Sequence, residues 1–419
     1  MVRRAWRLLV VGLLLCAGTL SACGSAASGG TITLTVSTNQ VGDQAKVLQQ
    51  IAQKFMQQNP NIKVDFSAPG AEYENIMKVK MASGHLPDVF STHGWAIIRY
   101  GKFLADLRDQ PWAAKLNSTI KSVITDSSGT VYVLPMDEDK TGPIYNVDIL
   151  QQYGVAVPST YDELLAACQT ILDKSHGQVT PIHIGGADAW PIGNFFDFFA
   201  TPSLISPPNN SAAALTNGTF DWSSNWTPLA RKFQELHQKG CLNKDVLTAK
   251  YTDSVDAFAK GKVAFGFYGP YLVDEVKKAT SSVHLGLMPI PSVVAGDPPT
   301  FAGGEKTTWG VWKDSKHLDA AKKFVAFYAQ PENITLVAQA DGLPAGLDGV
   351  QVDLGGLTPY FQQYASAPVF PYFDRVYLPN GMWDVMCKNG QDLLANSISP
   401  SQFSTNMKQQ FDRLRANGS

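Results

Sequence analysis

Carboxylates and aromatic rings are the side chains of this sequence best suited to act on a ligand. Asp137, Glu138 and Asp139 stand in a row, in a polar stretch between two segments with strand character. The chain has 9 Trp, 14 Tyr and 21 Phe residues, and several Trp stand in predicted loops. Paired carboxylates can hydrolyse a glycosidic bond as acid and base, or they can accept hydrogen bonds from hydroxyl groups. Three adjacent acids can equally form a solvated loop, so these residues leave binding, catalysis and exposure open.

Other site chemistries find little support. The 7 His residues are scattered and the cysteine spacing suits no metal site, so we expect no metal and no cofactor. A Gly-x-Ser-x-Gly nucleophile motif is absent. The formal net charge is −2, and it becomes more negative if Arg3, Arg4 and Arg7 are removed with a signal peptide. This balance, with no basic stretch, argues against a nucleic-acid partner.

The first thirty residues are typical of an export signal and a tether. A basic segment, an apolar run over 8–20 and small residues precede Cys23, and the run is too short to span a bilayer. Leu20-Ser21-Ala22-Cys23 resembles the lipobox of bacterial lipoproteins, which implies a signal peptide over 1–22, lipid on Cys23 and a tether over 23–30. An ordinary cleaved signal with a chance Cys is the alternative, and the Sec and twin-arginine routes both stay open.

Three cysteines remain beyond this region: Cys168, Cys241 and Cys387. An odd number outside the cytoplasm permits at most one disulfide and leaves a spare thiol. Three pairings are possible and the sequence does not choose among them, nor does it exclude three buried thiols.

Alternating strand and helix periodicity predicts an α/β fold with a largely parallel sheet. Strand patterns at 31–37, 62–66 and 88–90 enclose helical patterns at 45–58 and 74–83. Nearly 400 mature residues exceed what one core usually serves, so we expect two domains. Later elements are strands at 131–135, 143–146, 263–268 and 308–312, helices opening at 158 and over 228–239, 253–260, 270–278 and 318–329, and a Pro-rich linker over 288–299.

The order of short motifs resembles family 1 extracellular solute-binding proteins, the family of maltose-binding protein, from about residue 31 to the C-terminus. Each motif is weak alone, but their order and spacing together are specific. The segments that carry the resemblance are Pro87-Asp88-Val89-Phe90 before Gly101-Lys102-Phe103-Leu104-Ala105-Asp106-Leu107, Tyr132-Val133-Leu134-Pro135 with Ile144-Tyr145-Asn146, Pro158 with Thr160-Tyr161-Asp162-Glu163-Leu164, Phe258 to Phe265 ending in Gly269-Pro270-Tyr271, Gly303-Gly304 with Trp309-Gly310-Val311, Ser315-Lys316-His317 with Ala320-Ala321 and Phe324-Val325, and Trp383 ahead of Ser397-Ile398-Ser399-Pro400.

This resemblance implies a two-lobe clamp of the type II periplasmic-binding-protein kind, with the ligand in the cleft between lobes. Lobe 1 would comprise 31–142 and 301–346, and lobe 2 would comprise 143–300 and 347–419. The implied function is to capture a sugar or oligosaccharide for an ABC importer by lobe closure, as a monomer that docks on the permease and is held at the membrane by the lipid on Cys23.

The resemblance also implies the ligand-binding residues. Asp139 is the closest match to the family's carboxylate, counted back from Tyr145-Asn146, and Tyr271 stands where the family often has Trp. Any of the Trp residues can instead pack in a core. The implied residues are Asn39, Gln40, His93, Trp95, Asp137, Asp139, Trp190, Tyr268, Tyr271, Gly303, Gly304, Trp309 and Trp383.

Three alternatives remain beside the sugar. The same clamp could hold another solute, such as glycerol phosphate, a polyamine or iron, although Arg is sparse for a phosphate and no Tyr and His cluster suits iron. A secreted glycoside hydrolase would use the paired carboxylates. A sensor or adhesion lipoprotein without an importer is a third interpretation.

Overall fold

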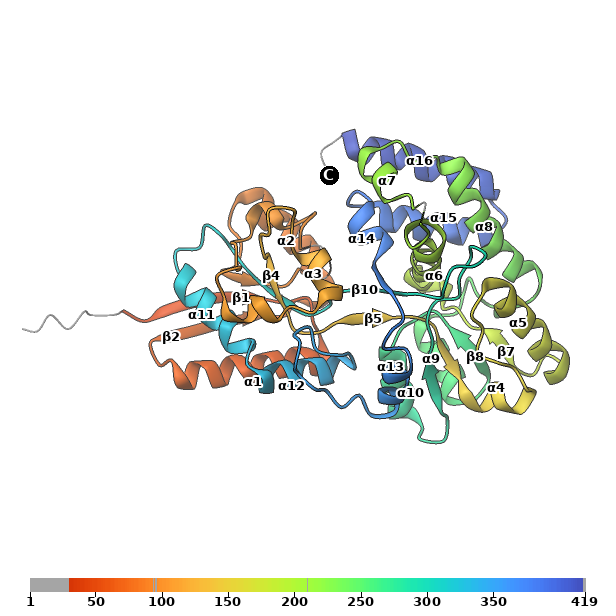
Figure 1. Ribbon diagram of the computed structural model, residues 1–419, viewed down its shortest axis with the longest axis horizontal. Helices are drawn as coiled ribbons and strands as arrows, with labels where there is room; N and C mark the ends of the chain where they lie inside the picture. Colours follow the sequence, from red (N-terminus) through yellow and green to blue (C-terminus); the bar gives the residue numbers. More distant parts are fainter. Residues whose placement is uncertain (1–29, 93, 95, 209, 417–419) are drawn as a thin grey trace, which may run out of the picture.

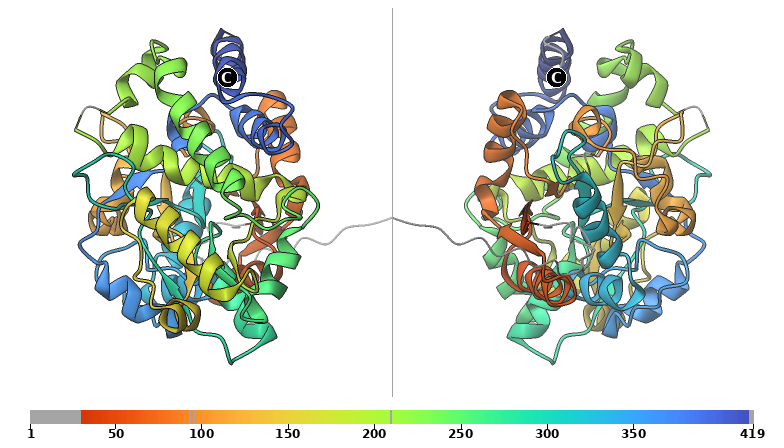
Figure 2. Two further views of the ribbon diagram at one scale, coloured as in Figure 1. Left: turned by 90° about the vertical axis from the view of Figure 1, so that its right-hand side faces the viewer. Right: turned by 90° about the vertical axis from the view of Figure 1, so that its left-hand side faces the viewer.

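The computed structural model describes residues 30–416, apart from 93, 95 and 209, and these form two lobes joined by three strands (Figure 1). Figure 2 places lobe 2 in front in one view and lobe 1 in front in the other. The predicted signal, tether and lipidated Cys23 lie outside the described residues, as do His93 and Trp95.

Lobe 1 is built on a five-stranded mixed sheet in the order β2-β1-β3-β11-β4. β1 pairs in parallel with β2 and β3, whereas β11 is antiparallel to both of its neighbours. In α1, Leu48, Ile51, Ala52 and Phe55 are buried at helical spacing, which is the stripe that the sequence predicts. The elements of lobe 1 are β1 Ile32–Ser37, α1 Gly42–Gln58, β2 Ile62–Ser67, α2 Tyr73–Ser83, β3 Val89–Phe90, α3 Ser118–Ile124, β4 Val133–Pro135, β11 Thr308–Val311, α11 Leu318–Tyr328 and α12 Pro331–Asp341.

Lobe 2 is built on a four-stranded sheet in the order β7-β8-β6-β9. Its helix α5 begins as predicted, because the Thr160 hydroxyl accepts the Glu163 amide and the Glu163 carboxylate accepts the Thr160 amide. The elements of lobe 2 are β6 Ile144–Asn146, α4 Val147–Tyr153, α5 Tyr161–Ser175, β7 Thr180–Ile182, α6 Trp190–Ala200, α7 Ala212–Asn217, α8 Trp222–Gln238, α9 Tyr251–Ala259, β8 Val263–Gly266, α10 Tyr271–Ala279, β9 Leu285–Leu287, α13 Thr358–Gln363, α14 Phe373–Tyr377, α15 Met382–Leu394 and α16 Pro400–Ala416.

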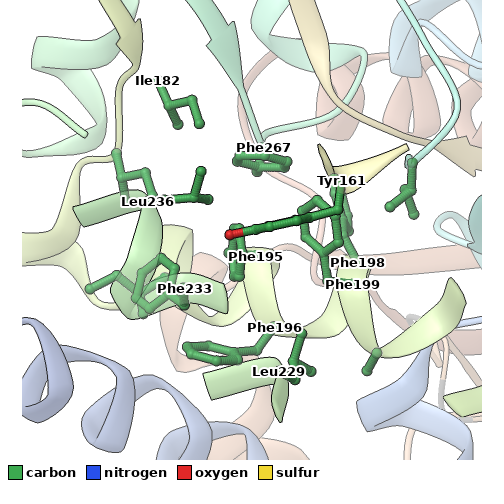
Figure 3. Close-up of a cluster of buried hydrophobic side chains, with 14 of the residues drawn as sticks. Tyr161, Ile182, Phe195, Phe196, Phe198, Phe199, Leu229, Phe233, Leu236 and Phe267 are labelled. Carbon is green, nitrogen blue, oxygen red and sulfur yellow. The ribbon is translucent and has the colours of Figure 1, made fainter. Parts of the chain in front are cut away.

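Helix α6 lies at the centre of an aromatic core in lobe 2 (Figure 3). The ring of Phe195 lies 4.5 Å from Phe233, 4.7 Å from Phe199 and 5.2 Å from Phe267. The helix begins at Trp190 with Pro191 in its first turn, a position that suits proline. The sequence pattern predicts no helix in this segment. Its helix is apolar on nearly every side, so the amphipathic pattern that would reveal it is missing.

Three strands connect the lobes, in the order β12-β10-β5. They are β5 Asp139–Thr141, β10 Phe301–Gly304 and β12 Val369–Pro371, and Figure 1 shows β5 and β10 running between the lobes. β5 falls inside the polar stretch predicted as a loop. Its partner β10 lies more than 150 residues further along the chain, so no local pattern marks the pairing. At Gly303 an added Cβ would lie 2.3 Å from the Asp139 carbonyl oxygen, so only glycine allows this close pairing.

One disulfide crosslinks lobe 2. Cys168 on α5 is bonded to Cys241, which follows α8, and their Cα atoms are 5.7 Å apart. Cys387 on α15 is a buried free thiol. The structure therefore selects one of the three pairings that the sequence leaves open. Of the helices within the described residues, none has the length and apolar character needed to cross a membrane.

Candidate functional site

A cavity of about 570 Å³ lies between the two lobes, and the strands that join them form its base. Lobe 1, the hinge strands and lobe 2 all contribute to it. Charged, amide and aromatic side chains make up much of the lining. They are Glu74, Lys78, Arg99, Lys306 and Asp341 from lobe 1, Asp139 from β5, and Trp190, Asn194, Asp197, Tyr268, Tyr271, Tyr372, Asp374, Arg375, Asn380, Trp383 and Asp384 from lobe 2.

Asp139 forms the base of the cavity at the hinge. The Tyr372 hydroxyl donates a 2.7 Å hydrogen bond to its carboxylate, and the Arg375 guanidinium lies 4.0 Å from the centre of the Tyr372 ring. Burial raises the pKa of Asp139, while Arg375 and the Tyr372 hydrogen bond oppose this shift. Asp139 therefore presents a carboxyl group that is already oriented by lobe 2.

Asp137, only two residues earlier, does not line the cavity. Its two carboxylate oxygens accept the backbone amides of Lys306 and Thr307, each at 2.9 Å. Burial raises the pKa of Asp137 well above its usual value, and the nearby Asp341 adds to the shift. Asp137, which was predicted to contact the ligand, thus lies outside the cavity lining, and its oxygens hold the chain where it leaves β10 for lobe 1.

Lys306 and Asp341 continue this network to the cavity wall. The Lys306 ammonium donates to Asp341 at 3.1 Å, and the Thr307 hydroxyl donates to the other Asp341 oxygen at 2.8 Å. Burial lowers the pKa of Lys306, but Asp341, Asp137 and Asp139 outweigh burial and raise it overall. Lys306 therefore stays charged beside Asp139.

The aromatic wall belongs to lobe 2. The Trp190 ring centre lies 5.0 Å from Tyr251, 5.8 Å from Tyr268 and 6.3 Å from Tyr271. The Tyr268 hydroxyl is bonded to the Ser254 hydroxyl and accepts the Gly185 amide, so this ring is held in place. Of the predicted aromatic residues, Trp190, Tyr268, Tyr271 and Trp383 line the cavity.

Trp383 is the half-buried second residue of α15, and its ring packs against α6. A Cβ added at Gly193 would lie 2.9 Å from the Trp383 ring and 2.5 Å from the Cys387 sulfur. Gly193 therefore makes room for the indole ring against the helix.

Asp197, Asp374 and Arg375 are cavity residues that the sequence analysis missed. Asp197 lies on α6 and Asp374 is the second residue of the short helix α14, and the Asp374 backbone amide donates a 2.8 Å hydrogen bond to the Asp197 carboxylate. A signal was present: Asp197 is the one charged residue within Asn-Phe-Phe-Asp-Phe-Phe. A lone carboxylate in such an apolar run indicates a buried polar site.

Arg99 lines the cavity and contacts both lobes. Its guanidinium forms an ion pair with Glu74 on α2 and donates 2.5 Å to the Asn380 side chain of lobe 2. The Arg99 side chain is 10% exposed, which shields this contact from water.

Several predicted ligand residues lie outside the cavity lining. Trp309 is fully buried in the core of lobe 1 against Phe66 and Tyr328, because β11 is an interior strand of the sheet. Gly303 and Gly304 pair within the hinge strands. Gln40 donates 2.8 Å to the Thr307 hydroxyl and so supports the chain behind the cavity, and Asn39 does not reach the lining either.

Metal chemistry finds no support in the described part of the chain. No group of three or more His, Cys, Asp or Glu side chains there could hold a metal ion. What the cavity offers is hydrogen bonding from buried charged groups beside flat aromatic rings, which is the combination that orients a polar ligand with apolar faces.

Comparison with known proteins gives consistent matches along the chain. The model of the family described as bacterial extracellular solute-binding protein matches residues 40–335. The melibiose/raffinose/stachyose-binding protein MelE of Bacillus subtilis is 39% identical over 401 residues, covering 96% of this chain and 93% of MelE.

Two solved structures share the fold over nearly the whole length. A putative binding protein of Bacillus subtilis, crystallised in an open conformation, is 38% identical with a TM-score of 0.89, covering 94% of this chain and all of that one. A sugar transporter protein of Bacillus licheniformis in complex with stachyose is 42% identical with a TM-score of 0.81, covering 91% of this chain and all of that one.

Proposed function

The chain belongs to the bacterial extracellular solute-binding protein family, and from that premise we propose that it captures galactose-containing oligosaccharides for an ABC importer. The ligands proposed are melibiose, raffinose and stachyose, the sugars in the name of MelE. These sugars share a terminal galactose, so one recognition site at the base of the cavity would serve all three.

The observation that carries the proposal is the composition of the cavity. Buried carboxyl groups and a guanidinium at its base lie beside the rings of Trp190, Tyr271 and Trp383. A sugar ring has weakly apolar CH faces that stack on aromatic rings and a rim of hydroxyls that need donors and acceptors. A volume of about 570 Å³ falls within the range typical of small-molecule sites.

The charges of the cavity favour a neutral ligand over the other solutes considered. Asp139, Asp197, Asp374 and Asp341 would repel a phosphate, while Lys306 and the two arginines would repel a polyamine. Because the lining holds both cations and carboxylates, a ligand with many hydroxyls and no charge satisfies both kinds of group.

We assign the carboxylates to hydroxyl recognition and not to hydrolysis. Asp197 and Asp374 are in hydrogen-bonding contact, whereas the carboxyl groups of a glycosidase stand about 5 Å or more apart. Purified protein incubated with raffinose is expected to leave the sugar intact. Release of free galactose that Asp139→Asn abolishes would overturn the binding function in favour of an enzyme.

Calorimetry tests the ligand class directly. Titration with melibiose, raffinose and stachyose is expected to give saturable heat, and thermal unfolding is expected to shift upward with each sugar because they bind the native state. Spermidine and glycerol 3-phosphate serve as the control ligands. Binding of either control with no response to the three sugars would contradict the proposal.

The mechanism proposed is lobe closure around the ligand. A sugar that contacts both walls binds the closed form better than the open form and shifts the equilibrium toward it. The closed, loaded protein then docks on the permease of the importer. Small-angle scattering is expected to show a smaller radius of gyration with saturating raffinose than without it.

We also propose that lipid on Cys23 holds this receptor at the outer face of the cell membrane. Metabolic labelling with a radioactive fatty acid is expected to mark the wild type and not Cys23→Ala, which should appear in the medium. Equal labelling of both forms would exclude this anchor and leave the sugar-binding proposal unaffected.

A further inference from the structure

Two carboxyl groups in the cavity wall touch each other. Asp197 on α6 and Asp374 at the start of α14 both line the cavity and are 3% and 7% exposed. The Asp374 amide donates 2.8 Å to Asp197, and the two carboxyl groups are themselves hydrogen-bonded. These residues are 177 positions apart in the chain, so tertiary packing and not local structure brings them together.

A hydrogen bond between two carboxyl groups requires a proton on one of them. Two ionised carboxylates in contact, away from water, repel strongly, so such a pair holds one proton over a wide pH range. Burial raises the pKa of Asp197 well above its usual value and the charge of Asp374 adds to this; burial also raises the pKa of Asp374.

The groups around the pair come from several elements. The cations are Arg375, on α14, and Arg99, which reaches over from lobe 1. The Cys387 thiol on α15 and the Tyr372 phenol before α14 are neighbouring weak acids. Burial is the main cause that raises the pKa of each, so neither group ionises near neutral pH. Asp139 on β5 and Asp384 on α15 are two further carboxyl groups in the cavity lining.

We propose that Asp197 and Asp374 act as one recognition unit that holds a single proton and binds two neighbouring sugar hydroxyls, one through its donor and one through its acceptor. The inference rests on the proposed sugar-binding function and identifies which part of the lining selects the ligand. A neutral carboxyl group can donate and a carboxylate only accepts, so the pair offers both roles at one place. Two adjacent hydroxyls, each of which can donate or accept, complement it.

Affinity then depends on pH with a fixed sign. Above the midpoint of the pair, the proton is lost, the donor disappears and a second negative charge faces the sugar. Because one proton must be bound with the ligand, the dissociation constant is expected to rise about tenfold per pH unit above that midpoint. Below the midpoint the slope is expected to vanish.

The first test needs no ligand. Carboxyl ¹³C resonances of aspartate-labelled protein are followed against pH in the wild type, Asp374→Asn and Asp197→Asn. The wild type is expected to show an aspartate midpoint well above the usual range that both variants lack, beside the raised midpoints of Asp137 and Asp139, which both variants keep. Asn imitates the protonated acid in shape and can donate to the remaining carboxylate, so either variant should fold, and two variants guard against the failure of one. Normal midpoints for both residues in the wild type would overturn the shared proton.

The second test links the proton to the sugar. Raffinose titrations between pH 5 and 9 are expected to lose their pH slope in Asp374→Asn and to keep it in Asp384→Asn, which removes a cavity carboxylate outside the pair. A slope that survives in Asp374→Asn would overturn the recognition unit. A protein with the high midpoint that binds none of the three sugars would instead overturn the proposed function, and the recognition role with it, while the shared proton stands.

Discussion

The wall that lobe 2 presents to the cavity combines aromatic rings with charged groups, whereas the polar groups of the lobe 1 wall are charged and have no aromatic ring beside them. Trp190, Tyr268, Tyr271 and Trp383 all come from lobe 2, and no aromatic side chain of lobe 1 is among the described lining residues. Lobe 1 contributes Glu74, Lys78, Arg99, Lys306 and Asp341.

This difference suggests an order of binding. Aromatic rings packed in a core are already in place before the ligand arrives, whereas long charged side chains lose conformational freedom when they are ordered. We therefore expect lobe 2 to supply a preformed surface for the first encounter and lobe 1 to add hydrogen bonds as it closes. Substitutions in either wall, or at the junction between the walls, test this difference.

The largest effect is expected from removing the support beneath the aromatic wall. Phe195→Ala would leave a cavity in the centre of lobe 2 and lower the free energy of unfolding by about 3–5 kcal/mol, measured by urea denaturation. Leu336→Ala, on the surface of lobe 1, is the control with an expected change within about 0.5 kcal/mol, because Leu336 is 39% exposed. Equal stability of the two variants would show that α6 tolerates the loss.

The junction between the walls is expected to respond to pH through Glu305. Burial raises the pKa of Glu305 to about 7 from its ordinary value of 4.5. The folded protein therefore holds a proton there that the unfolded chain releases, so this carboxyl costs stability progressively as pH rises from 4.5 to about 7 and costs nothing further above it.

Glu305→Gln removes that cost. At pH 8 this variant is expected to be more stable than the wild type by on the order of 3 kcal/mol, and at pH 4 the difference should shrink toward zero. Urea denaturation at several pH values measures both ends. Parallel pH profiles for the two proteins would show that Glu305 keeps an ordinary pKa.

Loss of a ring from the lobe 2 wall should weaken binding without affecting the fold. Trp383→Ala is expected to raise the free energy of sugar binding by about 1–2 kcal/mol, because the stacking surface disappears. Trp383→Phe keeps a smaller ring and should fall between this variant and the wild type in calorimetry. An unchanged affinity in Trp383→Ala would remove this residue from the site.

The smallest effect is expected at the lobe 1 wall. Arg99→Lys keeps the charge but loses the forked geometry that reaches both Glu74 and Asn380, so affinity should fall by about 1 kcal/mol or less. Stopped-flow fluorescence should place the change in the dissociation rate, since lobe 1 engages after the first encounter. A slower association rate with unchanged dissociation would contradict the proposed order.

The sequence predicted the elements of lobe 1 well because their signals are local. In α1 the apolar residues recur at helical spacing, and β1 and β2 are continuous strands that pair over six residues. In lobe 2 the helix α6 was missed, since a helix that is buried on nearly every side has no polar face to set its period.

The candidate site was only partly predictable for a related reason. Trp190 and Trp383 could be inferred from motif position, but the contact between Asp197 and Asp374 exists only after α14 folds back on α6. The opposite placements of Asp137 and Asp139 also depend on partners far along the chain, at Lys306 and Tyr372. The local sequence pattern cannot tell which of these acids lines the cavity, because two nearby aspartates differ only in the distant residues that they contact in the folded protein.

The position of β11 within its sheet has a consequence for synthesis and export. This strand lies between β3 and β4, yet it emerges only after α4 to α10 of lobe 2 have left the ribosome or the translocation channel. Until then β4 has no neighbour to join it to β1, β2 and β3. Lobe 1 therefore cannot close its core while its first strands are being made, and its exposed strand edges need protection during transit. For the same reason neither lobe can be produced alone by truncation.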